Sequence, residues 1–519
     1  MFEPRVISTT DVPPALAPLD RIVVAYVALP LFIFLVGWFE WWVAAILVLC
    51  SAYALRTNFI RWNERAARAP ITTQQIAIAV IAGCAWTVLG GSDHLFFANM
   101  DWHVRDAVLH DLVVSAWPVG YGLHDGRETL LRAPLGYYLP AAIIGKAAGI
   151  SAAYIALLAW TAMGACLFLL QVLSLVEKRI SAALVALGVV ILFSGADIVG
   201  ELLNDGPQFR MHWDLPTHIE WWAGSYQYSS MTTQLFWVPN HALSGWLMIG
   251  LLFRCDARSD LDSLLPMLMV AVALWSPLTA LGLVPFVAWR VAVGIFRHHW
   301  LRLLDPRIWA PSLIVGLAVS AYLTLAAATV SHGSSLSGWD SDDAVMSLLR
   351  QMQFFILEAG LIGLAIWLIR PSAELTIALL VLALLPALSL GPNNDLVMRT
   401  SIPALTVLAI NAFTALLDKS QQQKIVQKKA FLTALLLVGA MTPVAELARA
   451  LIFPVWPVNL TATLIGADCG GFAPHYVAEM EGQVVTHVLR QPTQLPLGPL
   501  GPESCNNPAN EIVYRRYGP

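Results

Sequence analysis

Apolar residues occur along this chain in blocks about as long as a bilayer is thick, and this pattern restricts the fold more than any other feature. The hydrocarbon core offers no hydrogen-bond partners, so a segment that crosses it must satisfy its own backbone, as a helix does. Of the 519 residues, 58% are hydrophobic and 12% are charged, whereas a soluble domain carries about 25% charged residues. The sequence therefore predicts an all-α polytopic membrane protein.

The apolar blocks alternate with polar segments along the whole chain. The run 135–149 contains Lys146 and is too short to cross a bilayer comfortably. We expect this run to lie in the interface or to re-enter the membrane from one side. The thirteen predicted spans are 22–37, 41–55, 75–91, 151–176, 181–199, 236–253, 262–276, 279–296, 309–330, 353–369, 375–390, 401–417 and 430–453.

Basic residues orient these blocks, because cytoplasmic loops of membrane proteins are enriched in Lys and Arg. With the thirteen spans above, all six basic clusters fall on one side, and they would not if 135–149 crossed. This predicts a multi-pass protein of the cytoplasmic membrane, with 1–21 in the cytoplasm and 454–519 as a small extracytoplasmic segment. The clusters are Arg56/Arg61/Arg65/Arg68, Lys178/Arg179, Arg254/Arg258, Arg297/Arg302, Arg370 and Lys419/Lys424/Lys428/Lys429.

The sequence lacks the motifs of several functional classes and of a signal peptide. The net charge of −4 provides no basic surface for a nucleic-acid partner. Walker loops, GxGxxG and GxSxG are absent, and the N-terminal 1–21 lacks the apolar core of a signal peptide. No Cys/His spacing typical of zinc occurs. Cys469 and Cys505 are the natural disulfide pair if the C-terminal segment faces an oxidising compartment.

The predicted extracytoplasmic segment 92–134 is densest in ionisable residues. From Asp101 to Leu112 it reads as an amphipathic helix at the membrane surface. A carboxylate at the start of such a helix could act as a base or a metal ligand. The alternative is an interfacial helix with (i, i+4) pairs such as Asp101–Arg105. Arg105, on the same stripe as Asp101, is also a candidate for substrate binding. A second stripe could bind a divalent metal or substrate and consists of His103, Asp106 and His110.

The next predicted extracytoplasmic segment, 200–235, interleaves acids with aromatic residues. Aromatic faces with nearby carboxylates and amides suit sugar rings, whereas the alternative is an aromatic belt that anchors helix ends. Acids and histidines beside a spanning helix are functional candidates. The candidates are Asp197, Glu201 and Asp205 for catalysis, and Trp222, Gln234 and His241 for substrate binding.

The short segment 391–400 carries a third set of candidates between two apolar blocks. Arg399 could hold a lipid phosphate in a bidentate grip. It could equally pair with Asp395, four residues earlier. Asn394 is a further candidate for substrate binding.

This layout resembles the GT-C class of membrane glycosyltransferases over most of residues 70–420. In that class a cytoplasmic N-terminus precedes a large extracytoplasmic loop, which opens with a catalytic Asp and continues as juxtamembrane helices. Asp101 in NMDWHVRDAVLHDL stands where that Asp is expected, and RAPLGYYLPAAIIGK resembles the Pro- and Tyr-rich entry that follows. The chain departs from the class at Asp101-Trp102-His103, where many members have Asp-Glu or Asp-x-Asp, and in the extra hairpin 22–55 before the core 70–453.

The resemblance implies a polyprenyl-phosphate-linked sugar donor that is dissolved in the lipid bilayer. It also implies that Asp101 is catalytic, that Asp197 or Glu201 is a second acid, and that Arg399 grips the donor phosphate. The stretches TTQLFWVPNHAL and NNDLVMRTSIPAL further resemble a bacterial family of uncharacterised membrane proteins, and that likeness names no substrate.

Three functional hypotheses follow. The first is a glycosyltransferase that moves a sugar to a lipid, glycan or protein acceptor at the extracytoplasmic face. In this hypothesis Asp101 is the base, one of the acids of 197–205 assists it, and Arg399 binds the donor phosphate. The second is a transporter or flippase for a glycan, lipid or solute, which would need ionisable residues at mid-bilayer. The third is a non-catalytic scaffold for envelope assembly. The gathering of polar residues at one predicted face favours surface chemistry.

Overall fold

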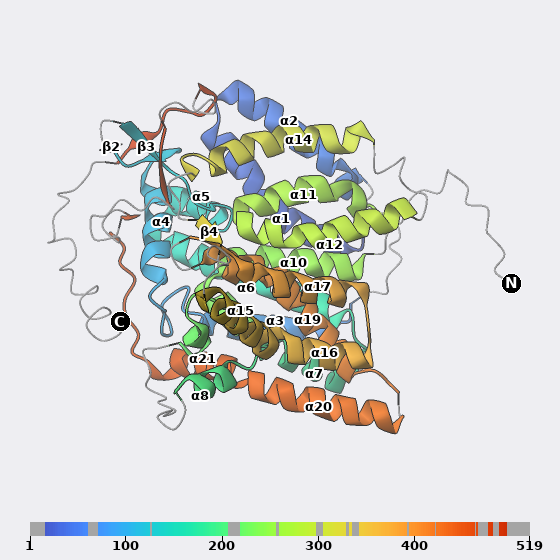
Figure 1. Cartoon of the computed structure of the whole chain (residues 1–519). Coiled ribbons are helices and arrows are strands. Elements are labelled where there is room, and N and C mark those ends of the chain that lie inside the picture. Colours follow the sequence, from blue (N-terminus) through green and yellow to red (C-terminus); the bar gives the residue numbers. More distant parts are fainter. Residues whose placement is uncertain are drawn as a thin grey trace, which may run out of the picture.

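The protein is a bundle of helices in a computed structural model. Figure 1 shows most of the long helices lying side by side along one common direction. The structure describes residues 16–60, 71–124, 127–205, 218–255, 259–296, 305–327, 332–334, 342–391, 394–420, 422–461, 463–464, 476–480 and 487–495.

Helices form almost all of the regular structure, and η4 is a π-helix, while η2 and η5 are 3-10 turns. The helical elements are α1 (Pro18–Trp38), α2 (Trp41–Ile60), α3 (Thr73–Leu89), α4 (Trp102–Val114), α5 (Leu139–Ala148), α6 (Ile150–Leu173), α7 (Ile180–Ile191), α8 (Asp197–Asp205), η2 (Ile219–Ala223), α9 (Met231–Trp237), α10 (Pro239–Arg254), α11 (Leu261–Trp275), α12 (Pro277–Phe296), α14 (Pro306–Leu323), α15 (Asp342–Phe355), η4 (Ile356–Gly360), α16 (Leu361–Ile369), α17 (Ala373–Leu384), η5 (Leu385–Ala387), α18 (Asp395–Thr400), α19 (Ile402–Leu416), α20 (Gln423–Gly439) and α21 (Met441–Ile452).

Among the described residues, seven helical stretches are long and apolar enough to cross a membrane. This confirms the predicted class, a helical and membrane-embedded protein, while the number of thirteen spans stays a prediction. Large apolar side chains on the perimeter support the same conclusion, since Ile81, Leu317 and Leu437 are each more than 60% exposed. The seven stretches are Pro18–Trp38, Ile150–Leu173, Pro277–Phe296, Pro306–Leu323, Val345–Ile369, Asp395–Leu416 and Gln423–Ile452.

Three of the predicted spans are interrupted, and each interruption lies next to polar residues. The predicted span 181–199 ends early, because α7 stops at Ile191 and a separate helix, α8, begins at Asp197. The span 353–369 contains the π-turn η4, which carries Glu358. The span 430–453 breaks at Ala440, between α20 and α21. These breaks bring acidic side chains from three distant segments to one level of the bundle.

The run 135–149 forms α5, a helix of ten residues. Ten residues rise about 15 Å, which is half of a hydrocarbon core, so α5 is too short to cross. Gly149 then reverses the chain into α6 at a φ of 91°, a conformation that favours glycine. Lys146 near the end of α5 donates to the carbonyl of Ser115, just after α4. The end of α5 that carries Lys146 therefore lies beside the end of α4, and that the run does not cross the membrane stays a prediction.

We call the end of the bundle that carries α4 the α4 end (Figure 1). At the opposite end, where α1 begins and α10 finishes, Arg254 forms a buried ion pair with Asp20. Lys419 and Arg179 both pair with Glu177 at the loop after α6. Basic residues from several predicted cytoplasmic clusters thus gather away from α4.

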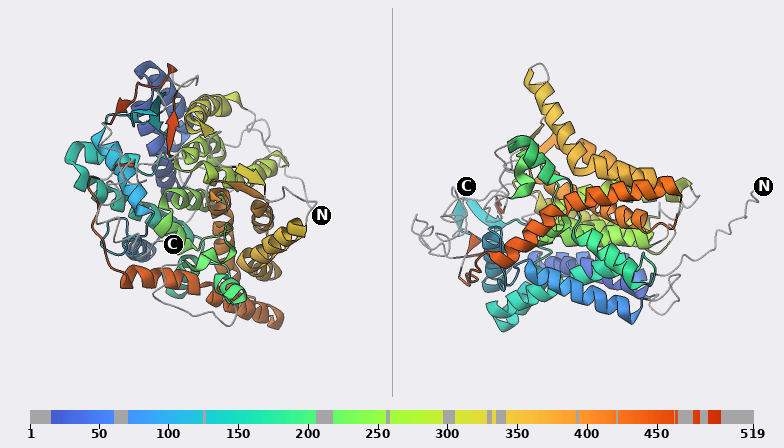
Figure 2. Two further views of the ribbon diagram at one scale, coloured as in Figure 1. Left: turned by 60° about the vertical axis from the view of Figure 1, so that its left-hand side comes forward. Right: turned by 90° about the horizontal axis from the view of Figure 1, so that it is seen from below.

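The C-terminal segment packs onto the first polar segment through short strands, and Figure 2 shows these strands at the same end as α4. β3 pairs with β6, β1 pairs with β7, and β4 pairs with β5. Residues 476–480 and 487–495 are therefore attached to the transmembrane core. The strands are β1 (Val119–Gly120), β2 (Leu123–His124), β3 (Arg127–Leu131), β4 (His332–Ser334), β5 (Leu388–Leu390), β6 (Val477–Glu479) and β7 (Thr493–Gln494).

Candidate functional site

The start of α4 is fixed to the end of α9 by two hydrogen bonds, and a third holds Asp101. Asn99 Nδ2 and Trp102 Nε1 both donate to the carbonyl of Phe236, at 2.8 and 3.2 Å. The backbone N–H of Asp101 in turn donates to Asn99 Oδ1 at 3.1 Å. The carboxylate of Asp101 is thereby held at a defined place on the α4 end, where its side chain is 42% exposed.

Arg105 lies one turn along α4 and is almost completely buried. Its Nη2 lies 3.2 Å from Asp101 Oδ2. Its Nε and Nη1 have no hydrogen-bond partner among the described residues. Burial lowers the pKa of Arg105, but the charge of Asp101 and the phenols of Tyr138 and Tyr476 raise it by more, so the guanidinium is charged. A buried cation with two unused donors is suited to an oxyanion.

Arg399 offers a second guanidinium. Its Nη2 lies 2.9 Å from Asp395 Oδ1, and its Nε is buried with no hydrogen-bond partner in the part of the chain that the structure describes. The short helix α18 that carries it packs tightly on α12, where a Cβ at Gly282 would collide with the carbonyl of Thr400. This close approach requires glycine and positions the arginine.

Both arginines lie close enough to His241 and Tyr476 for their charges to act on these two side chains, so we group these four residues with Asp101. His241 opens α10, and its Nδ1 lies 2.6 Å from Ser276 Oγ, between α11 and α12. Tyr476 precedes β6 in the C-terminal segment, and burial raises its pKa. We call this group the paired-arginine site, and it consists of Asp101, Arg105, His241, Arg399 and Tyr476.

Four of these five residues were candidates from the sequence, and Tyr476 was missed. No local sequence pattern could have identified Tyr476, because long-range contacts place it. One of them is the hydrogen bond from the N–H of Arg132 to the carbonyl of Tyr476, at 2.7 Å. Asn394 lies near the site but is buried, and its Oδ1 accepts from the N–H of Leu390 at 3.3 Å. The side chain of Asn394 therefore shapes the turn that leads into α18.

The stripe His103, Asp106 and His110 does not converge on one point. Asp106 Oδ2 lies 2.9 Å from His94 Nε2, and His110 Nδ1 lies 3.1 Å from Asp111 Oδ1. His103 instead stacks on the ring of Trp456, with centroids 4.4 Å apart. Within the described ranges, no three His, Cys, Asp or Glu side chains form a group that could hold a metal ion.

We expect His103 to destabilise the fold in mild acid. Burial, and secondarily the charge of His94, lowers the pKa of His103 to about 4. The unfolded chain takes up this proton near pH 6.5, so stability falls as pH falls from about 6.5 to about 4. The free energy of unfolding in detergent should be measured at pH 7 and at pH 5. Between these two values it should fall by roughly 1–2 kcal/mol more in wild type than in His103→Gln. Parallel losses in the two proteins over this interval would contradict the assignment.

A second group of ionisable residues is buried deeper, and we call it the acid cluster: Asp197, His218, Glu220, Glu358 and Glu446. Asp197 Oδ2 accepts from Ser194 Oγ and Thr442 Oγ1, both at 2.8 Å. Glu358 Oε1 accepts from Trp222 Nε1 at 2.8 Å.

The rest of the acid cluster continues through η2 to α21. Glu220 accepts from the N–H of Ser230, at 2.8 Å, and from Thr233 Oγ1, at 2.6 Å. Burial raises the pKa of Glu220 to about 6. His218 Nε2 lies 3.3 Å from Glu446 Oε1. The cluster therefore runs from α8 and η4 to α21 through short polar contacts.

The remaining candidates from the sequence divide between the acid cluster and the protein core. Trp222 belongs to the wall of the acid cluster through its contact with Glu358. Gln234 is fully buried and joins Trp246 Nε1 to the carbonyl of Ser229. Glu201 is half-buried on α8, and Asp205 ends that helix. The predicted disulfide between Cys469 and Cys505 lies outside the described residues.

Comparison with known proteins supplies no relative. No family model, no curated protein and no solved structure matches this chain.

Proposed function

We propose that the protein is a GT-C-type glycosyltransferase that uses a polyprenyl-phosphate-linked sugar. The observation that carries the proposal is the buried guanidinium of Arg105, which has two unused donors and lies 3.2 Å from the half-exposed carboxylate of Asp101. Arg399, which has one unused donor, acts on the same neighbouring side chains. Arginine binds phosphate through its planar fork of N–H groups. Asp101 adds a base at the same place, so one site combines the two groups that glycosyl transfer from a lipid phosphate requires.

In the proposed reaction, an acceptor hydroxyl oxygen attacks the anomeric carbon of the donor. The bond between that carbon and the phosphate oxygen breaks, and its electron pair stays on the lipid phosphate. Arg105 and Arg399 stabilise this developing negative charge. The carboxylate of Asp101 takes the proton of the acceptor hydroxyl. A divalent metal fits less well at this point, since the two arginines already supply positive charge to the phosphate.

The position of the site suits a donor that cannot leave the bilayer. Asp101 and Arg105 of the paired-arginine site lie on α4 at one end of the bundle, and Tyr476 precedes β6, which pairs with β3 at the same end. A lipid phosphate sits at this level while its chain remains in the hydrocarbon core. Under the orientation predicted from basic residues, this end is the extracytoplasmic face of the cytoplasmic membrane.

We expect Arg399→Gln to lower sugar transfer by about 10²–10³-fold, because loss of a preorganised donor on developing charge has effects of this size. Arg399→Lys should fall between this variant and wild type, since it keeps the charge but loses the fork. The assay is transfer from polyprenyl-phosphate-linked hexoses and pentoses to a membrane extract in proteoliposomes. The control is Arg127→Gln, an exposed arginine of the α4 end that pairs with Glu479. Unchanged transfer in Arg399→Gln would contradict its role.

The second candidate function is a transporter or flippase, and the acid cluster favours it. The carboxyl groups of Asp197 and Glu358 lie beside each other, and both residues are buried. Buried acids at helix breaks are a common means of moving protons through membrane proteins. The same proteoliposomes separate the two functions, because a transporter accumulates solute or moves lipid without forming a covalent product.

A further inference from the structure

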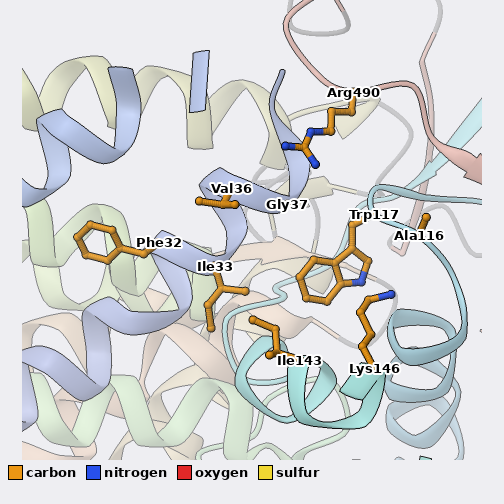
Figure 3. A pocket seen from close by; sticks show the side chains of 9 residues that line it. All are labelled: Phe32, Ile33, Val36, Gly37, Ala116, Trp117, Ile143, Lys146 and Arg490. Carbon is orange, nitrogen blue, oxygen red and sulfur yellow. The ribbon is translucent and has the colours of Figure 1, made fainter. Parts of the chain in front are cut away.

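A groove of about 650 Å³ lies between α1 and α5 at the α4 end, separate from both clusters above. Figure 3 shows its lining, with apolar side chains on one side of Trp117, Lys146 beside the indole and Arg490 near Gly37. The apolar part comes from Phe32, Ile33 and Val36 of α1 and from Ile143 of α5. The cationic side chains are Lys146 and Arg490.

The two cationic side chains come from distant parts of the chain, and not all of their N–H donors are engaged in hydrogen bonds within the protein. Lys146 Nζ donates to the carbonyls of Ser115 and Val113 and lies 5.0 Å from the centre of the Trp117 ring. Arg490 donates through its Nε to the carbonyl of Phe39 at 2.8 Å. Its two Nη groups have no partner among the described residues, so they are available to an anion.

The apolar part of the groove continues along the lipid-facing side of α1. Ile22, Leu29 and Val36 recur at intervals of seven residues and are each 45–53% exposed, so they form one stripe on the perimeter. Their 14-residue separation corresponds to about 21 Å, more than the ~15 Å that one leaflet contributes to the hydrocarbon core. An acyl chain could therefore follow this stripe into the groove.

Tryptophans place the cationic end of the groove at headgroup level. Trp41 and Trp42 begin α2, beside the turn that Arg490 contacts, and they are 74% and 50% exposed. Exposed Trp residues concentrate at the boundary between headgroups and hydrocarbon. At that boundary, Lys146 and Arg490 face lipid phosphates rather than acyl chains.

We propose that this groove binds one anionic phospholipid of the bilayer, with an acyl chain against α1 and α5 and its phosphate between Lys146 and Arg490. Charge complementarity selects the occupant, because the apolar wall ends in two cations and no acid lines the groove among the described residues. This site does not depend on the proposed sugar transfer. It adjoins the end of α4, and the helix of 13 residues separates it from Asp101 by about 20 Å.

The test is native mass spectrometry of the full-length protein with phosphatidylglycerol and phosphatidylcholine that carry identical acyl chains. Wild type should bind one phosphatidylglycerol at least about tenfold more tightly, because two basic residues favour a net anionic headgroup and choline offsets the phosphate charge. Lys146→Gln/Arg490→Gln should abolish this preference. Val36→Trp, which fills the apolar part, should weaken binding of both lipids.

Two control variants test whether the lipid preference comes from the positive charges of this groove. Arg127→Gln removes a cation at the same end but outside the groove, and it should keep the preference. Lys146→Arg/Arg490→Lys retains both charges and should keep most of it. Equal binding of the two lipids by wild type would overturn the proposal, and so would an unchanged preference in the double glutamine variant. Neither outcome depends on whether the protein transfers sugar.

Discussion

Asp101→Asn should lower the rate of sugar transfer by about 10²–10⁴-fold, the range expected when a general base is removed. The amide keeps the shape of the side chain but cannot take a proton from the acceptor hydroxyl. The Asp101 side chain is 42% exposed, so the loss should come from chemistry rather than from unfolding. The measurement is product formed per protein in proteoliposomes at saturating donor.

Asp93→Asn is the matched control for this prediction. Asp93 lies in the same polar segment, and its Oδ1 accepts from the N–H of Leu95 at 3.1 Å rather than from an arginine. It should retain transfer. If Asp101→Asn transferred sugar normally while Arg399→Gln did not, the site would bind a lipid phosphate but use another base.

Arg254→Met should lower the free energy of unfolding by about 3–5 kcal/mol, since it leaves the charge of Asp20 buried without a partner. Arg254 Nε and Nη2 lie 2.5 and 3.3 Å from the two carboxylate oxygens of Asp20, and both side chains are 2% exposed. The pair joins the start of α1 to the end of α10. Reversible unfolding in mixed detergent micelles measures the loss.

Two comparisons make this result specific to the buried charge. Asp20→Leu/Arg254→Met removes both charges and should recover much of the stability, because the penalty comes from the unpaired partner. Arg179→Met breaks an exposed pair with Glu177 and should cost no more than about 1 kcal/mol. Similar losses in Arg254→Met and Arg179→Met would show that burial does not govern the effect.

The paired-arginine site and the acid cluster relate differently to what the sequence predicts. Asp101, Arg105, His241 and Arg399 were identified because charged residues beside apolar blocks are rare and stand out. Asp197 was a candidate for the same site, yet it belongs to the acid cluster with Glu358, and it accepts from Thr442 of α21. Local patterns name ionisable residues next to the membrane, but they contain no information on which of them meet.

Interruptions of helices were the least predictable part of the fold. The apolar block 353–369 reads as continuous, but η4 replaces one turn of it with a π-turn and carries Glu358 into the acid cluster. Hydropathy cannot detect such a turn, because a π-turn keeps the chain helical and its neighbours apolar. The C-terminal segment is a similar case, since Tyr476 reaches the paired-arginine site through strand pairing with a segment more than 300 residues earlier.

The sequence by itself determined that the chain is a helical membrane protein, that six of its basic clusters are predicted on one side, and that Asp101 and Arg399 are candidates for chemistry. It could do so because placing polar groups in hydrocarbon is costly for each segment separately. Apolar blocks of membrane length therefore recur along the sequence and can be recognised one by one. Only the tertiary structure decided that Arg105 lies against Asp101 with two unused donors, that the buried acids form a separate cluster, and that Lys146 and Arg490 share a groove. Those pairings depend on how segments hundreds of residues apart pack, and packing is a property of the whole chain.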